Sequence, residues 1–180
     1  MKISLFSKQR GGDVSFEEII SPYVEHLYRI AYHYTQNQSD AEDLVQDLLV
    51  KLFPKTAEMR QVDNLKAWLA RSLYNLFIDK TRQANRQPTN KAESLDDENQ
   101  YFTPSAAPSS TPQQHDLIRD LERALGQLSE DHRLVVVLHD VESYTLEEVS
   151  KIYDIPVGTL KSRLHRARAQ LRKYLSDGTI

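Results

Sequence analysis

The chain has 180 residues, no cysteine and a formal net charge of −3, from 23 Lys or Arg and 26 Asp or Glu. This length suits one ordinary domain or two small ones, and the nearly balanced charge gives no global indication of a nucleic-acid partner. No apolar run approaches the roughly 20 residues that a bilayer requires, and the N-terminal apolar run is too short for a signal peptide. We therefore expect a cytoplasmic protein without membrane insertion.

The first helical region is predicted to follow an N-terminal extension over residues 1–14. Ser15 and Glu18 form a capping box, in which a hydroxyl at a helix start and an acid three residues later satisfy free backbone N–H groups. Apolar residues then recur at helical spacing to about residue 35. Pro22 is expected to mark a new helix start within this region.

The segment 40–53 carries the strongest helical pattern in the chain. Ser39 and Glu42 form a second capping box, and apolar residues follow at the i, i+3, i+4, i+7 spacing until Pro54, which is expected to end the helix. The opposite side is a polar strip with one apolar residue, a composition suited to a protein partner. It comprises Asp43, Gln46, Asp47 and Val50.

A loop over 54–63 is predicted to lead to a long helix through about residue 82, with Asp63 or Asn64 as its cap. Trp68 falls on the apolar stripe of this helix, and we interpret it as a core residue rather than a base-stacking one. The other side combines aromatic and basic residues, which suit unstacked bases and phosphates.

Residues 87–115 are predicted to be a flexible linker. The segment is rich in Pro, Ser, Asn, Gln and acids and shows no apolar period. A structureless run of that length is improbable inside one compact domain, so the chain is expected to form two domains, 15–86 and 116–176.

The C-terminal part is predicted to contain four helices. An amphipathic segment covers 116–128, and Ser129 caps a helix to about residue 141. A short helix with a Thr145–Glu148 capping box ends at Asp154, and a longer helix begins at Pro156. Such a pair is a helix-turn-helix. The apolar stripe of its second helix is formed by Leu160, Leu164, Ala167 and Leu171.

Charge changes sign along the chain. Residues 13–63 are acidic and 64–91 basic, and the pattern repeats with acidic 92–154 and purely basic 157–175. This pattern favours two modules that each offer one face to a polyanion, although solvated charge faces explain either basic helix alone equally well.

No catalytic constellation is present in the sequence. The six histidines include no i, i+4 pair and no HExxH motif, and the few glycines do not form a phosphate-binding loop. We therefore expect no enzyme activity, no metal site, no cofactor and no small-molecule substrate.

Three segments carry a family resemblance: DAEDLVQDLLVKLF (40–53), NLKAWLARSLYNLFIDKTRQ (64–83) and the C-terminal stretch 124–175, which contains IPVGTLKSRLHRARAQL (155–171). In this order and at this separation they resemble the two domains of extracytoplasmic-function (ECF) sigma factors, in the sigma-70 family of bacterial RNA polymerase. The resemblance implies an all-α fold of two small helical domains joined by a flexible linker. Its expected partners are core RNA polymerase, promoter DNA and an anti-sigma factor.

In the first domain, which resembles sigma region 2, the strip on 40–53 would bind core polymerase. The loop and following helix would recognise the minus-10 element, capturing a flipped base. The candidates for DNA contact are Met59, Gln61, Asp63, Asn64, Lys66, Arg71, Tyr74, Asn75, Lys80, Arg82 and Arg86. The loop lacks the aromatic and glycine residues common in the family, which leaves the base preference open.

In the second domain, which resembles sigma region 4, the last helix would enter the major groove of the minus-35 element. Base edges are assigned to Lys161, Ser162, His165 and Arg166, and phosphates mainly to Arg163, Arg168, Arg172 and Lys173. Thr159 is expected to bond a phosphate or cap the helix. Arg166 is the preferred single candidate, because a guanidinium binds guanine O6 and N7 together.

Two other functions remain open from the residues alone. An autonomous helix-turn-helix regulator would bind duplex DNA tightly without polymerase, but it leaves the strip on 40–53 unexplained. An interaction module without DNA binding is disfavoured by the intact basic helix. The acidic linker residues Asp96, Asp97 and Glu98 would either imitate RNA in the polymerase or belong to a simple tether.

Overall fold

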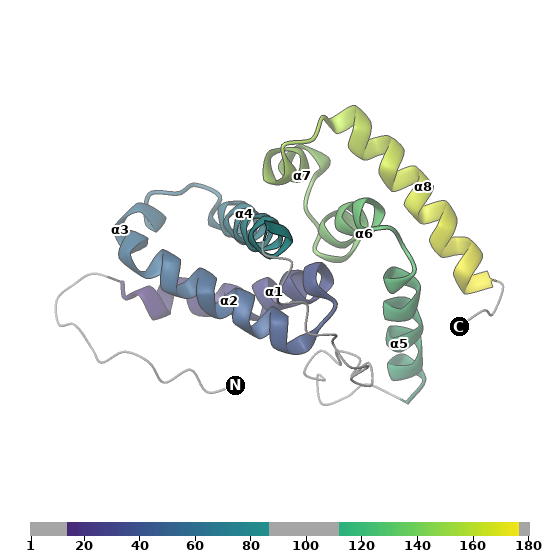
Figure 1. The fold of residues 1–180 in the computed structure, drawn as a ribbon, viewed down its shortest axis with the longest axis horizontal. Coiled ribbons are helices and arrows are strands. Elements are labelled where there is room, and N and C mark those ends of the chain that lie inside the picture. Colours follow the sequence, from purple (N-terminus) through teal and green to yellow (C-terminus); the bar gives the residue numbers. More distant parts are fainter. Residues whose placement is uncertain (1–13, 87–111, 177–180) are drawn as a thin grey trace.

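The computed structural model describes residues 14–86 and 112–176, with the backbone alone for 112–118. Helices and turns account for the secondary structure of these ranges, and no strand occurs in them. The helices form two lobes that lie side by side (Figure 1). The predicted all-α class is confirmed, while the N-terminal extension and most of the expected linker lie outside the described residues.

The N-terminal lobe contains α1 (Phe16–Thr35), α2 (Gln38–Leu52), a 3-10 turn η1 (Phe53–Lys55), α3 (Thr56–Met59) and α4 (Leu65–Arg86). Helices α1, α2 and α4 pack against one another around leucines that are fully or almost fully buried. The leucines at the centre of this core are Leu27, Leu44, Leu48, Leu69 and Leu73. Trp68 is half-buried and packs against the same core, as the sequence predicted.

Two predicted helix starts in this lobe are wrong. Helix α1 runs unbroken through Pro22. Proline has no N–H, so the backbone carbonyl one turn earlier loses its helical hydrogen bond. Pro22 is exposed, which leaves that carbonyl free to bond water. Helix α2 begins before the predicted Ser39 box, because the side chain of Asn37 accepts a hydrogen bond from the Asp40 N–H at 3.0 Å. Asn caps a helix as well as Ser does. The box at Ser15 and Glu18 is confirmed.

The segment after α2 is more helical than the predicted loop. The 3-10 turn and α3 continue past Pro54, and Met59 is only 1% exposed. A buried thioether fixes this short helix against the core. Met59 was predicted to contact DNA, but in this conformation its side chain cannot touch a base.

The C-terminal lobe contains α5 (Pro112–Gly126), α6 (Glu130–Val136), a π-helical turn η3 (Val137–Val141), α7 (Leu146–Tyr153) and α8 (Val157–Ser176). Helix α5 starts four residues before the predicted domain boundary, with a proline at its first position, where the missing N–H costs nothing. The predicted helix 129–141 is divided between α6 and η3.

The segment after η3 turns back toward α1. The Glu142 N–H donates to the Val137 carbonyl at 2.9 Å, an i to i+5 bond that gives the turn its π geometry. Ser143 then adopts φ = 60°, a left-handed conformation that costs an ordinary residue about 1–2 kcal/mol. The flanking side chains of Glu142 and Tyr144 both reach His26 on α1.

The two lobes share one hydrophobic core. Helix α7 packs against α4, and α6 and η3 pack against α1. The sequence predicted two loosely tethered lobes with separate surfaces, and the packing between them corrects that picture for the conformation described here.

Burial of His33, on α1, makes the fold sensitive to acid. Desolvation lowers the pKa of His33 from 6.5 to about 4. Between these values the unfolded chain binds a proton that the folded chain excludes, so the free energy of unfolding falls by up to about 1.4 kcal/mol per pH unit as the pH drops. His33→Phe should remove this part of the acid sensitivity, as measured by urea unfolding at pH 7 and pH 5.

His165→Gln is the matched control, since His165 is exposed. It should retain the full loss of stability at pH 5. An unchanged acid sensitivity in His33→Phe would contradict the assignment.

Candidate nucleic-acid interface

The helix-turn-helix is held by local hydrogen bonds. Thr145 and Glu148 form the predicted capping box at the start of α7, and Asp154 ends that helix in the left-handed conformation with φ = 57°. The Ser150 hydroxyl donates to the Ile155 carbonyl at 2.6 Å across the turn. Helix α8 then begins after Pro156. These bonds fix the angle at which α8 leaves the turn.

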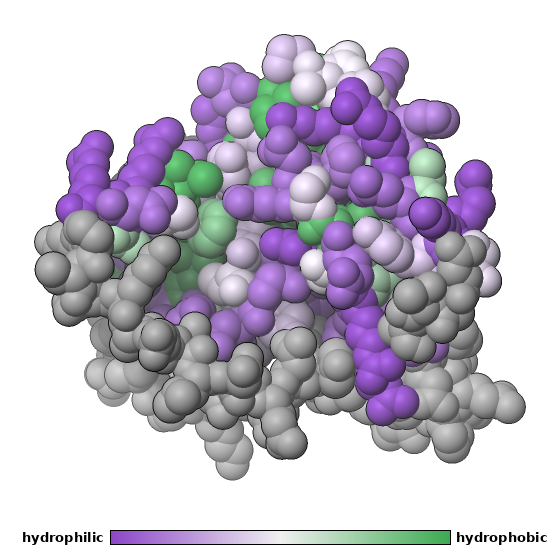
Figure 2. Space-filling model, turned by 45° about the vertical axis from the view of Figure 1, so that its right-hand side comes forward, coloured by the Kyte–Doolittle hydropathy of each residue, from purple (hydrophilic) through white to green (hydrophobic). Residues whose placement is uncertain are grey.

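Helix α8 is docked by its apolar stripe. Leu160, Leu164, Ala167 and Leu171 are buried, as predicted, against the other helices of the C-terminal lobe. Figure 2 turns this side of the molecule forward, and hydrophilic side chains cover most of its described surface. The predicted minus-35 residues that are exposed on α8 are Thr159, Lys161, Ser162, His165, Arg166, Arg168, Arg172 and Lys173.

Two of the predicted phosphate-binding arginines already have carboxylate partners. Arg168 donates two hydrogen bonds to Asp140, at 2.9 and 2.5 Å, which raise the pKa of its exposed guanidinium. Arg163 pairs with Asp131 at 2.9 Å and is half-buried. The acids at the end of η3 and the start of α6 therefore neutralise part of the basic face of α8.

The predicted polymerase-binding strip is brought together on α2. Asp43, Gln46, Asp47 and Val50 are all exposed on one side of the helix, and Val50 is 75% exposed. Asp47 also forms a salt bridge with Lys80 of α4. Asp47 was predicted to contact polymerase and Lys80 to contact DNA, so this ion pair joins residues assigned to different partners.

The start of α4 is occupied by groups from the other lobe. Asn64 caps the helix by accepting a bond from the Ala67 N–H, and its amide donates to Glu148 at 2.7 Å. The Lys66 amine donates to the Glu142 carbonyl at 2.8 Å and lies 4.5 Å from the centre of the Tyr144 ring. Two of the predicted minus-10 residues therefore contact the C-terminal lobe: Lys66 is half-buried there, and Asn64 remains exposed.

Tyr74 was predicted to be an exposed stacking residue, and the structure corrects this. Its ring packs edge-on against Tyr153 of the C-terminal lobe, with ring centres 4.5 Å apart, and Tyr34 stands 6.0 Å away. The other predicted minus-10 residues that are exposed, besides Lys80, are Gln61, Asp63, Arg71, Asn75, Arg82 and Arg86.

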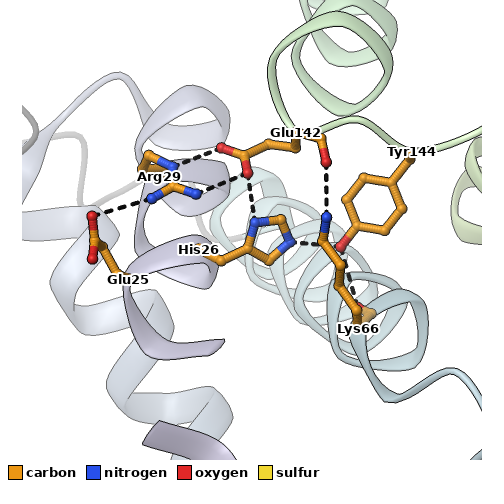
Figure 3. Close-up of polar contacts among 6 residues, drawn as sticks. All are labelled: Glu25, His26, Arg29, Lys66, Glu142 and Tyr144. Carbon is orange, nitrogen blue, oxygen red and sulfur yellow. Dashed lines mark hydrogen bonds and ion pairs between the residues drawn. The ribbon is translucent and has the colours of Figure 1, made fainter. Parts of the chain in front are cut away.

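The most connected polar cluster lies between the lobes and was missed in the sequence (Figure 3). Glu142 receives hydrogen bonds from His26 at 2.5 Å and from Arg29 at 2.8 and 3.0 Å. His26 Nε2 lies 2.6 Å from the Tyr144 hydroxyl, which donates to the Lys66 carbonyl at 3.2 Å. The Tyr144 hydroxyl thus links His26 on α1 to the backbone of α4.

The carboxylate of Glu142 stays ionised in this cluster. Burial opposes its ionisation, but the hydrogen bonds from His26 and Arg29 outweigh burial and lower its pKa to about 2. Glu142 is only 5% exposed. A buried carboxylate that accepts three charge-assisted bonds from the opposite lobe fixes the relative position of the two lobes.

Further contacts extend the interface. Tyr34 and Tyr153 hydroxyls lie 3.1 Å apart, and burial raises the pKa of both. Arg133 donates to the His33 carbonyl of α1 at 3.1 Å.

No group of three metal-ligating side chains occurs in residues 14–86 or the described side chains beyond 118. None of the helices in those ranges is long and apolar enough to cross a bilayer.

An all-helical chain with a docked, basic helix-turn-helix belongs to the class of DNA-binding transcription proteins. Two family models match it: sigma-70 region 2 over residues 19–87, and sigma-70 region 4 over residues 118–171. The chain is a member of the sigma-70 family, within its extracytoplasmic-function group.

Two relatives show which members of this group the chain resembles in sequence. It is 35% identical over 164 residues to the ECF RNA polymerase sigma factor SigE of Mycolicibacterium smegmatis, covering 90% of this chain and 62% of the relative. It is 28% identical to the ECF RNA polymerase sigma factor SigW of Bacillus subtilis, covering 94% of this chain and 93% of the relative. The chain therefore spans less than two thirds of the SigE relative and nearly all of SigW.

A solved structure has the same arrangement of helices. The sigma factor RpoE, in complex with the anti-sigma factor NepR from Bartonella quintana, matches with a TM-score of 0.68 and 30% identity, over 89% of this chain and 96% of that one. CnrH, in complex with the cytosolic domain of CnrY, matches with a TM-score of 0.58 and 20% identity, which supports the fold alone.

Asp140 should restrain DNA binding by α8. Asp140→Asn removes a negative charge and frees Arg168 for a phosphate, so affinity for duplex DNA should rise and the slope of log K against log salt should steepen by about one. Fluorescence anisotropy over a salt series measures both quantities. Asp120→Asn, which alters an acid on α5, is the control and should leave the slope unchanged. An identical slope in Asp140→Asn would show that Arg168 does not reach phosphate.

Proposed function

We propose that this chain is a promoter-specificity subunit that binds core RNA polymerase and directs it to promoters with particular minus-35 and minus-10 elements. The observation that carries the proposal is the pairing of two surfaces: an exposed polar strip on α2 and an exposed basic face on a docked recognition helix, α8. A DNA-binding regulator that acts alone needs only the second surface.

Each of the two lobes is assigned its own contacts. Residues 15–86 act as the domain for core polymerase and the minus-10 element, and residues 116–176 act as the domain for the minus-35 element. Helix α8 is basic and exposed at the positions that reach base edges, and the exposed residues of α4 include Arg71, Asn75 and Arg82. The chain supplies recognition and no catalysis of its own, and it works in the cytoplasm beside the polymerase.

An anti-sigma protein is the further partner that this function implies. The solved neighbour RpoE carries one, NepR. Such a protein would silence the chain by covering the α2 strip and the DNA-binding faces.

The primary test is reconstitution. The chain should co-purify with core RNA polymerase and support promoter-dependent run-off transcription from a library of promoter fragments of its own genome. Tight duplex binding without core polymerase, together with no transcript in its presence, would instead establish the autonomous helix-turn-helix regulator.

Arg166→Ala should lower the recognition of the minus-35 element and leave core binding intact. One bidentate contact to guanine is worth about 1–3 kcal/mol, so specific affinity should fall roughly 5- to 150-fold for the preferred sequence. Arg172→Ala, by contrast, should weaken binding to all sequences alike. Lys151→Ala, on the exposed side of α7, is the control. Equal loss of core binding and DNA binding in Arg166→Ala would contradict the assignment.

Val50→Asp should weaken core polymerase binding without destabilising the fold, because this side chain is 75% exposed. An exposed apolar residue within a polar strip gains the most from burial in a complex. We expect at least about a tenfold loss of affinity for core polymerase in a pull-down titration. Val14→Asp makes the same change at another exposed valine and should bind normally. Equal binding by both variants would remove the α2 strip from the interface.

A further inference from the structure

We propose that Gly158 lets helix α8 approach duplex DNA more closely than any larger residue at this position would allow. The space beside its Cα is then filled by the sugar–phosphate backbone at the edge of the major groove. The depth of the helix in the groove in turn sets which base edges its side chains reach. The proposal rests on the proposed function, because it takes α8 as the helix that enters DNA.

The backbone conformation of Gly158 does not require a glycine. The residue lies in the first turn of α8 and is helical, and it is the only glycine in that helix. Glycine is needed where the chain adopts a left-handed conformation, whereas in a helix it is less favourable than every ordinary residue except proline. Alanine would therefore suit this position in the folded chain better than glycine.

Packing within the chain does not require a glycine either. Gly158 is exposed, and a Cβ atom added to it would have no heavy atom of another described part of the chain within 4 Å. Gly126, at the end of α5, differs, because a Cβ there would lie 3.6 Å from the Gln36 side-chain oxygen. The described residues thus leave the space at Gly158 open to a partner.

Gly158 lies on the side of α8 that is predicted to meet DNA. Ser162 and Arg166 follow it by four and eight residues, so the three positions share one face of the helix, and all three are exposed. The buried residues Leu160 and Leu164 lie on the opposite side. A larger side chain at Gly158 would project from the DNA-binding face one turn ahead of Ser162.

Ser162 adds little bulk to the same face. Its hydroxyl donates to the Thr159 carbonyl at 2.8 Å, so the side chain lies along its own helix. Arg166, one turn later, is long enough to extend away from the helix. A face that is low at Gly158 and Ser162 allows the helix backbone to lie near DNA while the guanidinium reaches a base edge.

Close approach has a direct effect on base readout. Hydrogen bonds form when donor and acceptor lie within about 3.2 Å, so a displacement of α8 by the width of a methyl group would break the contact between Arg166 and a base. Attraction to phosphates falls off slowly with distance, and long cationic side chains can follow the backbone. A methyl group at Gly158 should therefore reduce specific binding more than general affinity for DNA.

The test separates stability, specific binding and general binding in the full-length chain. The wild-type chain first selects its preferred sequence from a pool of short duplexes of random sequence. Fluorescence anisotropy over a salt series then gives the affinity for that selected duplex and for the unselected pool. The variants are Gly158→Ala and Gly158→Val, and thermal unfolding records the stability of each.

Gly158→Ala should raise the unfolding temperature by about 1–4 °C, because alanine favours the helix. Its affinity for the selected duplex should fall at least about fivefold, because the added methyl group overfills the contact and moves α8 outward. Affinity for the unselected pool should change by less than about twofold, and the salt slope should stay the same because no charge is altered.

Gly158→Val should lose more specific affinity than Gly158→Ala, because it is bulkier. Its β-branched side chain favours the helix less than alanine does, so the order of the two variants in stability is not that of glycine, alanine and valine in size. A steric effect on DNA binding is thereby separated from an effect on the fold.

Gly126→Ala is the matched control. It adds the same methyl group to α5, at an ordinary contact distance from Gln36, and should leave both DNA affinities unchanged.

Three results would overturn the close approach at Gly158. The first is unchanged affinity of both Gly158 variants for the selected duplex, the second is an equal fractional loss for both probes, and the third is a wild-type chain that selects no sequence. The proposed function fails differently, through the absence of promoter-dependent transcription by the wild-type chain with core polymerase.

Discussion

The relative position of the two lobes depends on one buried carboxylate. Glu142 leaves water almost completely, and the cost of that desolvation is offset by three hydrogen bonds from His26 and Arg29. Loss of one partner in such a cluster typically costs about 3–5 kcal/mol, which is a large part of the stability of a small protein. The contact therefore fixes how the two lobes meet, within one hydrophobic core that both lobes share.

Helix α4 contributes to the core of its own lobe on one side and to the contact with the other lobe at its first turn. Its inner side, with Leu69 and Leu73, is buried in the N-terminal lobe, and its first turn offers Asn64 and Lys66 to the C-terminal lobe. Helix α8 differs from α4, because its apolar stripe packs only within its own lobe and its basic face remains exposed. The basic face of α8 is thus exposed, whereas the first turn of α4 contacts the other lobe and Arg71, Asn75 and Arg82 farther along α4 remain exposed.

Local sequence patterns predicted the helices well where apolar residues follow a single helical period. The stripe of α8 and the Thr145 capping box follow directly from spacing, and both are present. Spacing did not reveal that Asn37 competes with Ser39 as a cap or that Met59 is buried, because cap choice and burial depend on neighbours outside the segment. The cluster at Glu142 left no local signal, since His26 is 116 positions away.

The contacts between the lobes also differ in how salt acts on them. The Asn64 amide donates to Glu148 at an exposed position, whereas the carboxylate of Glu142 is only 5% exposed. Salt screens exposed charges much more than buried ones. Rising salt therefore acts on the edge of the interface rather than on the carboxylate at its centre.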